Sequence, residues 1–248
     1  AARAAEAAAA AVAHAVAAIA DALGAAVAVA DPARNRGHGI GGIGSDLGIP
    51  PDTGGVRETG HGGDMAADGY RLALDTGFRA ARAALEDLAV ATWEPLRAFA
   101  CTLTCAVAGP DALGVAQIGD GIAVARRDGG DLFAASRPQK GEYANEAHFL
   151  TRADALARVE HTVASGRADA VGLTTDGLLR LALRWPELAP HAPFWTPLLA
   201  FAARAGDPTW AGAQLAGFLG SPRVAARTDD DTTLVLAVRG GSGTAGGP

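Results

Sequence analysis

Residues 171–178 read Val-Gly-Leu-Thr-Thr-Asp-Gly-Leu, an apolar run that stops at a carboxylate and a glycine. The apolar part is typical of a strand buried in a sheet, and a helix is expected to begin directly after it. A second acidic segment, residues 229–231, is three consecutive aspartates and precedes the apolar residues 232–238, the expected last strand. Carboxylates next to two buried strands can be held rigidly at a common sheet edge.

Periodicity divides the rest of the chain into helices and strands. Apolar residues recur at three- and four-residue steps from Tyr70 to about Ala91, which predicts an amphipathic helix. Short apolar runs separated by Gly-Pro-Asp, Gly-Asp-Gly and Asp-Gly-Gly turns then predict a β-meander. This order of helices and strands indicates an α+β layered domain. The expected strands are 98–108, 113–118, 122–126, 132–135, 158–163, 170–175 and 232–238, and the expected helices are 1–23, 70–91, 176–185, 197–205 and 209–219.

The first quarter of the chain is dominated by alanine and then by glycine. Residues 1–23 favour a helix by propensity. Residues 32–69 are rich in glycine and are expected to form a long insertion loop. We therefore expect one domain over residues 1–239, interrupted by this loop and followed by a flexible tail at 240–248.

Composition and charge exclude several classes of partner. The chain has 21 Lys and Arg against 27 Asp and Glu, a formal net charge of −6, so a nucleic acid partner is not expected. The longest apolar stretch, residues 7–20, is mostly alanine and shorter than the roughly 20 strongly apolar residues that span a bilayer, so no membrane partner is expected. The opening residues lack the order of a secretory signal, which makes the cytoplasm the default location.

Aromatic residues make up only 5% of the chain, so its core must be built largely from small aliphatic side chains. Four aromatic residues fall on or beside expected helices of the C-terminal half. The simplest expectation is that they belong to the core, and the alternative is an apolar docking face. They are Trp185, Phe194, Trp195 and Trp210.

The two acidic segments suggest a metal site. Oxygen-only sites rich in carboxylates suit Mg²⁺ and Mn²⁺, which keep much of their water, and a metal-bound water is then available as a nucleophile. Spacing alone leaves two alternatives open. Asp-Gly after a strand is commonly a turn or a helix cap, and an acidic triplet is commonly a solvated loop.

Five short motifs follow one another over about half of the chain. They are Ala-Cys-Thr-Leu at 100–103, Gln-Ile-Gly-Asp-Gly at 117–121, Gly-Glu-Tyr-Ala-Asn-Glu-Ala-His-Phe-Leu-Thr at 141–151, Val-Gly-Leu-Thr-Thr-Asp-Gly-Leu at 171–178 and Arg-Thr-Asp-Asp-Asp-Thr-Thr-Leu at 227–234. In residue type, order and spacing, the chain resembles the metal-dependent type 2C serine/threonine protein phosphatases, in their bacterial branch. Ala147 departs from the pattern, since one bacterial subgroup tends to have Thr there.

This resemblance implies a four-layer α/β/β/α sandwich with two central antiparallel sheets. It also implies hydrolysis of phosphoserine or phosphothreonine in a protein by a Mn²⁺- or Mg²⁺-bound hydroxide, with a substrate of a bacterial Ser/Thr kinase as the natural partner. Asp176 and Asp230 would be metal ligands, and Asp120 would approach an additional metal position. Asp229 and Asp231 compete with Asp230 for its role, and Asp120 also fits the turn of a simple Gly-Asp-Gly hairpin.

The resemblance fails at the N-terminus. Family members begin with a strand that carries an Asn-Glu/Gln-Asp element and a phosphate-binding Arg, followed by a strand that ends in Asp-Gly-x-Gly. Residues 1–6 instead resemble the Ala-rich helix after these elements, so we expect an N-terminally incomplete domain with too few ligands for a binuclear site. Residues 25–31 could be a strand ending in a ligand, but Pro32 replaces the required glycine. The alternative functions are a catalytically silent phosphatase-like binding module and a truncated fragment of an active phosphatase.

Overall fold

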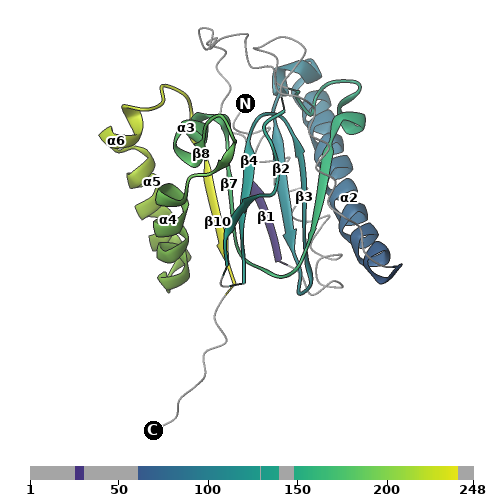
Figure 1. Ribbon diagram of the computed structural model, residues 1–248. Coiled ribbons are helices and arrows are strands. Elements are labelled where there is room, and N and C mark those ends of the chain that lie inside the picture. Colours follow the sequence, from purple (N-terminus) through teal and green to yellow (C-terminus); the bar gives the residue numbers. More distant parts are fainter. Residues whose placement is uncertain (1–25, 31–60, 129, 140–147, 240–248) are drawn as a thin grey trace.

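The computed structural model describes residues 26–30, 61–128, 130–139 and 148–239. Its strands are β1 (Ala26–Ala30), β2 (Leu103–Ala108), β3 (Ala112–Ile118), β4 (Ile122–Arg127), β5 (Leu132–Ala134), β6 (Glu160–Ser165), β7 (Ala168–Thr174), β8 (Leu183–Arg184), β9 (Ala189–Pro190) and β10 (Leu234–Val238). Two four-stranded antiparallel sheets form the centre (Figure 1). Sheet A has the order β1-β2-β3-β6 and sheet B the order β10-β7-β4-β5, while β8 and β9 form a separate pair.

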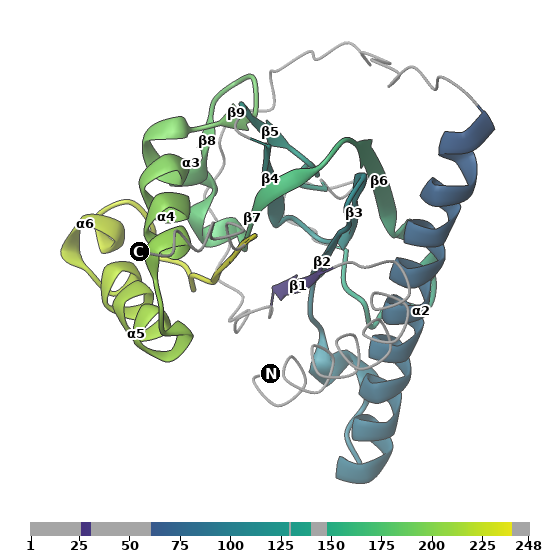
Figure 2. The same ribbon diagram turned by 90° about the horizontal axis from the view of Figure 1, so that it is seen from below.

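Helices cover the outer faces of both sheets. The long helix α2 (His61–Thr92) lies on sheet A, whereas α4 (Ala192–Arg204) and α5 (Pro208–Leu219) lie on the side of sheet B (Figures 1 and 2). The expected α/β/β/α sandwich is therefore confirmed. The shorter helical segments are η1 (Leu96–Phe99), η2 (Ala155–Arg158), η3 (Asp176–Leu178), α3 (Leu179–Ala182) and α6 (Pro222–Ala225). None of the helices in the described part of the chain is both long enough and apolar enough to span a membrane.

Alternation along the strands builds three apolar layers. On β3, Leu113 and Val115 pack between the two sheets, whereas Ala116 and Ile118 face α2. The same period of two on β4 separates residues between the sheets from residues that face α4. The layer between the sheets contains many small side chains, which agrees with the expected aliphatic core: Ala106, Ala123, Ala125, Ala135 and Ala168 all belong to it.

The predicted β-meander is wrong, because β3 and β4 belong to different sheets. The Gly-Asp-Gly turn carries the chain from sheet A to sheet B instead of forming a hairpin. Gly119 has a φ of 113°, and a Cβ atom there would lie 2.3 Å from Cγ2 of Thr102. Only glycine fits this position. The glycine therefore predicted a turn correctly, but this turn connects two sheets and does not form a hairpin.

Several predicted boundaries also moved. The strand expected at 98–108 begins at Leu103, after η1, and the helix expected to begin at Tyr70 begins at His61. Residues 61–69, which were expected in the glycine-rich loop, therefore belong to this helix. Each glycine costs a helix roughly 1 kcal/mol, but a helix anchored by buried Tyr70 and Leu74 can extend at its end, because each added residue gains one hydrogen bond.

Some expectations lie outside the described residues. The helix at 1–23, the loop at 32–60, the tail at 240–248 and the motif residues 141–147 are among them. Residues 26–30 form the edge strand β1, paired with β2, but Asp31 lies outside the described part of the chain. The domain boundaries remain predictions.

The C-terminal helices differ from the expectation in their limits. The helix expected at 176–185 ends at Ala182, and α4 begins at Ala192 and not at Pro197. Pro193 lies in the first turn of α4, where its missing N–H costs no intrahelical bond.

The four aromatic residues of the C-terminal half differ in burial. Phe194 and Trp195 are buried, as expected for the core, whereas Trp185 and Trp210 are half exposed, so the core expectation is wrong for these two.

Gly172 gives the first testable consequence of this packing. Trp195 lies across it, and a Cβ atom on Gly172 would be 2.2 Å from the indole ring. The ring is fixed because its Nε1 donates a hydrogen bond of 2.8 Å to the carbonyl of Ala182. We expect Gly172→Ala to lower the free energy of unfolding by about 2–3 kcal/mol, measured by urea denaturation. The control Gly206→Ala has no atom within 4 Å of its new methyl group and should stay within about 0.5 kcal/mol of wild type. Equal losses in both variants would contradict this account.

Candidate functional site

Three loops open at the same edge of sheet B. Thr174, the last residue of β7, is paired with Ile122, the first residue of β4, and with the first residue of β10. Because neighbouring strands are antiparallel, the loops before β4 and β10 and the loop after β7 meet at one edge. These loops carry Asp120, Asp230 and Asp176, and we call the three residues the aspartate rim.

The turn after β7 is fixed against the loop before β10. Asp176 begins η3 and is half-buried. A Cβ atom on Gly177 would lie 2.3 Å from the carbonyl oxygen of Asp231, so the two backbones are in direct contact. In addition, the backbone N–H of Thr233 donates a 3.1 Å hydrogen bond to Oγ1 of Thr175. Two chain segments distant in sequence therefore hold their carboxylates next to each other.

Electrostatics show that the rim carboxylates interact. Burial, followed by the negative charges of Asp120 and Asp230, raises the pKa of Asp176 to about 7, against backbone hydrogen bonds that lower it. The pKa of Asp120 is also raised, first by burial and then by the charge of Asp230. Without a cation the three carboxylates repel one another, which is the pattern expected where a positive ligand would be stabilised.

Among the three consecutive aspartates, Asp230 is the one whose charge acts on both other members of the rim. It is exposed, its N–H donates to Oγ1 of Thr228 at 3.2 Å, and its Oδ1 accepts from the N–H of Asp231 at 2.8 Å. Its electrostatic effect on Asp120 and Asp176 supports the choice of Asp230 over its neighbours. Its role as a metal ligand remains a prediction.

The aspartate rim has the type of ligand atom that a hard divalent cation prefers, but its side chains do not surround a single cation position. It offers carboxylate oxygens only, the donor type that suits Mg²⁺ and Mn²⁺. Among the residues that the structure describes, no three His, Cys, Asp or Glu side chains are grouped closely enough to hold a metal ion. Any cation here would therefore need water or further ligands to complete its coordination.

Two glutamines near the rim were missed by sequence reasoning as functional candidates. Gln117 and Gln139 are buried and hydrogen-bonded to the loop that carries Asp120. In the sequence, Gln117 was noted only as the first residue of the motif at 117–121, without a role of its own. Nothing in the sequence pointed to Gln139, because it lies 20 residues from the glycine it contacts.

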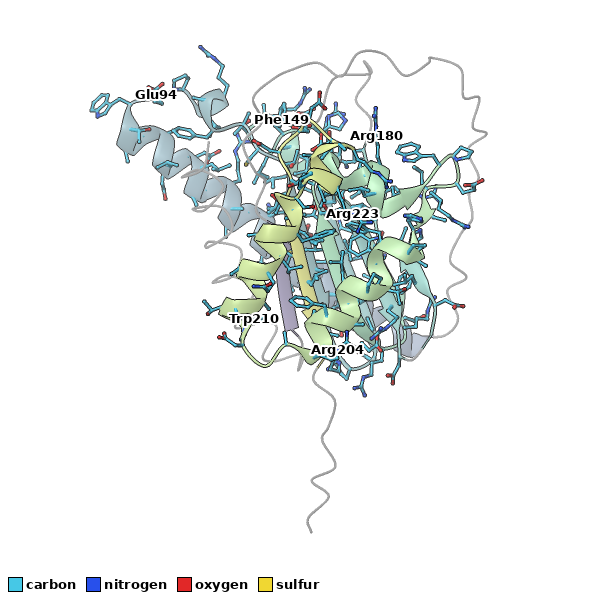
Figure 3. The ribbon with its side chains drawn as sticks, turned by 90° about the vertical axis from the view of Figure 1, so that its left-hand side faces the viewer. Glu94, Phe149, Arg180, Arg204, Trp210 and Arg223 are labelled. Atoms are coloured by element: carbon cyan, nitrogen blue, oxygen red, sulfur yellow. The ribbon has the colours of Figure 1, made fainter. Side chains whose placement is uncertain are left out.

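Two arginines lie at the same end of the molecule as the rim. Arg180 belongs to α3, four residues after Asp176, and Arg223 belongs to α6. Figure 3 shows both at this end, with Arg204 and Trp210 at the opposite end of the helical layer. Their positive charges lie at this end of the molecule, and sequence reasoning did not assign them (Figure 3).

Comparison with known proteins supports the resemblance found in the sequence. A family model described as "Protein phosphatase 2C" matches residues 1–220, which include Asp120 and Asp176. The chain is 43% identical over 145 residues to "Serine/threonine-protein phosphatase 3" of Escherichia coli (strain K12), and the match covers 58% of this chain. The matched part spans 57% of the length of that relative.

Two bacterial phosphatases are among the solved structures to which the chain is similar. The Mycobacterium tuberculosis serine/threonine phosphatase PstP/Ppp has a TM-score of 0.45 at 17% identity, over 68% of this chain and 72% of that chain. PppA, a regulatory component of the T6SS in Pseudomonas aeruginosa, has a TM-score of 0.45 at 18% identity, over 70% of each chain. The family match covers most of the sequence, and the chain belongs to the protein phosphatase 2C family.

Proposed function

We propose that this chain acts as a metal-dependent protein serine/threonine phosphatase, which hydrolyses phosphoserine and phosphothreonine in a protein substrate. The observation that carries this proposal is the aspartate rim, where carboxylates from three loops lie at one sheet edge, and burial together with the neighbouring charges raises the pKa of Asp176 and Asp120. Membership of the phosphatase family and the 43% identical phosphatase of Escherichia coli support the same reaction class.

In this proposal, Asp120, Asp176 and Asp230 would supply carboxylate oxygens to Mn²⁺ or Mg²⁺, and water or further ligands would complete the coordination. A divalent cation supplies Lewis acidity, which lowers the pKa of a bound water and polarises a phosphoryl oxygen. The chain's own contribution is to place the carboxylates: the contact of Gly177 with the backbone of Asp231 sets the spacing between Asp176 and the loop before β10. Arg180, at the same end of the molecule, offers a positive charge for a substrate phosphate.

The proposed substrate is a protein phosphorylated by a bacterial Ser/Thr kinase, and the proposed location is the cytoplasm. Aspartates exclude anions unless a cation neutralises them, so binding of a phosphorylated side chain at the rim should require the metal. This requirement separates a phosphatase site from a purely acidic patch.

One observation favours a second candidate, a catalytically silent binding module. In the described part of the chain the rim does not form a group of three ligands around one ion. If the cation binds weakly, the same scaffold could recognise a partner protein without turnover. Metal binding and hydrolysis must therefore be measured separately.

The test is hydrolysis of a phosphothreonine peptide, followed by release of inorganic phosphate. We expect hydrolysis with Mn²⁺ and a loss of about 100-fold or more after removal of the metal with EDTA, restored by adding Mn²⁺ back. Equal rates with EDTA and with Mn²⁺ would contradict the proposal. Binding of Mn²⁺ without phosphate release would favour the binding module.

A further inference from the structure

Two buried glutamines hold the loop that carries Asp120 from two directions. Gln117 lies on β3 and is 1% exposed, and Gln139 follows β5 and is 8% exposed. A buried amide is costly unless its donors and its acceptor are all used. Both glutamines have hydrogen bonds at the nitrogen and at the oxygen of the amide, and each contacts the backbone of residues 119–121.

The side chain of Gln117 joins three carbonyl groups around the loop. Its Nε2 lies 3.0 Å from the carbonyl oxygen of Gly119, 2.9 Å from that of Gly121 and 3.0 Å from that of Arg137, so its two hydrogens are shared among three acceptors. Its Oε1 accepts a 2.6 Å hydrogen bond from Oγ of Ser136. Only an amide has donors and an acceptor at its two ends, so neither a carboxylate nor a hydrocarbon side chain can replace it here.

Gln139 holds the same loop at Gly119. Its Oε1 accepts a 2.7 Å hydrogen bond from the N–H of Gly119, and its own N–H donates to the carbonyl of Gly119 at 3.1 Å. Its Nε2 donates to the carbonyl of Arg158 at 2.9 Å. Both polar groups of the Gly119 backbone are therefore bonded to one residue.

The loop also packs closely against β7 and β2 at Gly121. A Cβ atom on Gly121 would lie 2.8 Å from the carbonyl oxygen of Thr174 and 3.3 Å from Oγ1 of Thr104. Thr174 ends β7 two residues before Asp176. The contact between Gly121 and Thr174 therefore sets the position of Asp120 relative to Asp176.

We propose that Gln117 and Gln139 are positioning residues that hold Asp120 beside Asp176 and thereby set the affinity of the aspartate rim for a divalent cation. This inference rests on the proposed function, because it takes the cation as the ligand of the rim. Loss of either amide leaves buried carbonyl or N–H groups without partners. The loop then shifts to recover hydrogen bonds from water, and Asp120 moves away from Asp176.

The test compares Gln117→Met and Gln139→Met with Tyr70→Phe. Methionine has nearly the size of glutamine but forms no comparable hydrogen bonds. Tyr70→Phe is the matched control, because it removes the 3.1 Å hydrogen bond from buried Tyr70 to Oδ1 of Asp111, at the opposite end of β3. Binding of Mn²⁺ is measured by electron paramagnetic resonance. Amide hydrogen exchange of residues 118–122 is measured in the metal-free protein.

We expect both methionine variants to bind Mn²⁺ about 10-fold more weakly or worse and to exchange residues 118–122 faster, while Tyr70→Phe matches wild type in both measurements. Wild-type Mn²⁺ affinity in the methionine variants, or an equal loss in Tyr70→Phe, would overturn the inference. If Gln117→Met does not fold, Gln117→Asn is used in its place. Asparagine keeps the amide group, but its side chain is shorter by one methylene, so the amide cannot reach the same carbonyl groups.

The two proposals can fail separately. If wild-type protein binds no Mn²⁺, the proposed function fails, and hydrogen exchange alone decides whether the glutamines hold the loop. Unchanged exchange of residues 118–122 in both methionine variants would then overturn the positioning role. Faster exchange confined to this segment would support it.

Discussion

Asp176→Asn is expected to abolish Mn²⁺-dependent hydrolysis of the phosphothreonine peptide, with a loss of about 100-fold or more, and at the same time to stabilise the metal-free protein. Asparagine keeps the size of the side chain and one of its oxygens but removes the charge. The rim then has two carboxylates in place of three, so its attraction for a divalent cation falls. The same loss of charge removes the repulsion from Asp120 and Asp230.

The gain in stability should depend on pH. Burial and the two neighbouring charges raise the pKa of Asp176 to about 7 in the folded protein, above its ordinary value of 3.8. The folded state therefore binds a proton more tightly than the unfolded state, and wild-type stability falls as pH rises from about 4 to about 7. The Asp176→Asn variant has no carboxyl group at this position, so it does not lose this part of the stability as pH rises. At pH 8 in EDTA the variant should be more stable by roughly 1–2 kcal/mol, allowing for solvent screening of a partly exposed group, and at pH 4 the two proteins should be nearly equal.

Thermal unfolding at both pH values checks the stability, and phosphate release checks the activity. Asp87→Asn is the matched control, because Asp87 is exposed on α2, which covers sheet A (Figure 2), whereas the strands next to the rim belong to sheet B. It should leave both measurements close to wild type. An Asp176→Asn variant that hydrolyses the peptide at the wild-type rate would show that this carboxylate is not a metal ligand. A variant that is no more stable than wild type at pH 8 would show that the rim carboxylates do not repel one another.

Strand positions could be predicted because the central strands of both sheets have two buried faces. On β3 and β7 nearly every residue is apolar or small, and short turns separate such runs from their neighbours. The sheet that a strand joins was not predictable in the same way. A hairpin and a crossing between sheets both need glycine, so Gly119 and Gly121 predicted a turn without indicating its direction.

The candidate site was predictable to a similar extent. Asp120, Asp176 and Asp230 were identified by motif resemblance, and the register of β4, β7 and β10 explains why they meet at one edge. Gln139 could not be found, because its role depends on contacts between an irregular segment and the end of β3. Local sequence patterns do not encode which distant backbone groups need a partner in the folded protein.

Gly177→Ala is expected to be the second most damaging substitution, although it removes no functional group. The new methyl group would lie 2.3 Å from the carbonyl oxygen of Asp231 and 3.4 Å from Cγ2 of Thr232. These segments cannot separate easily, because Oγ1 of Thr174 donates a 2.7 Å hydrogen bond to the carbonyl of Thr233. Overpacking should lower the free energy of unfolding by about 1–3 kcal/mol. It should also move Asp176 away from Asp230 and reduce Mn²⁺-dependent hydrolysis by about 10- to 100-fold, since displacements of about 1 Å at a catalytic site have effects of this size.

Gly212→Ala provides the matched control, since it adds the same methyl group where no atom lies within 4 Å. Gly212 is inside α5, so alanine should stabilise the helix by up to about 1 kcal/mol and leave hydrolysis unchanged. Urea denaturation and phosphate release measure both variants. If Gly177→Ala lost stability but kept its Mn²⁺ affinity and its rate, the spacing between the turn after β7 and the loop before β10 would not govern the site. A parallel loss of affinity and rate in Gly177→Ala alone would mean that the backbone contact, and not only the carboxylates, determines whether the rim can hold a cation.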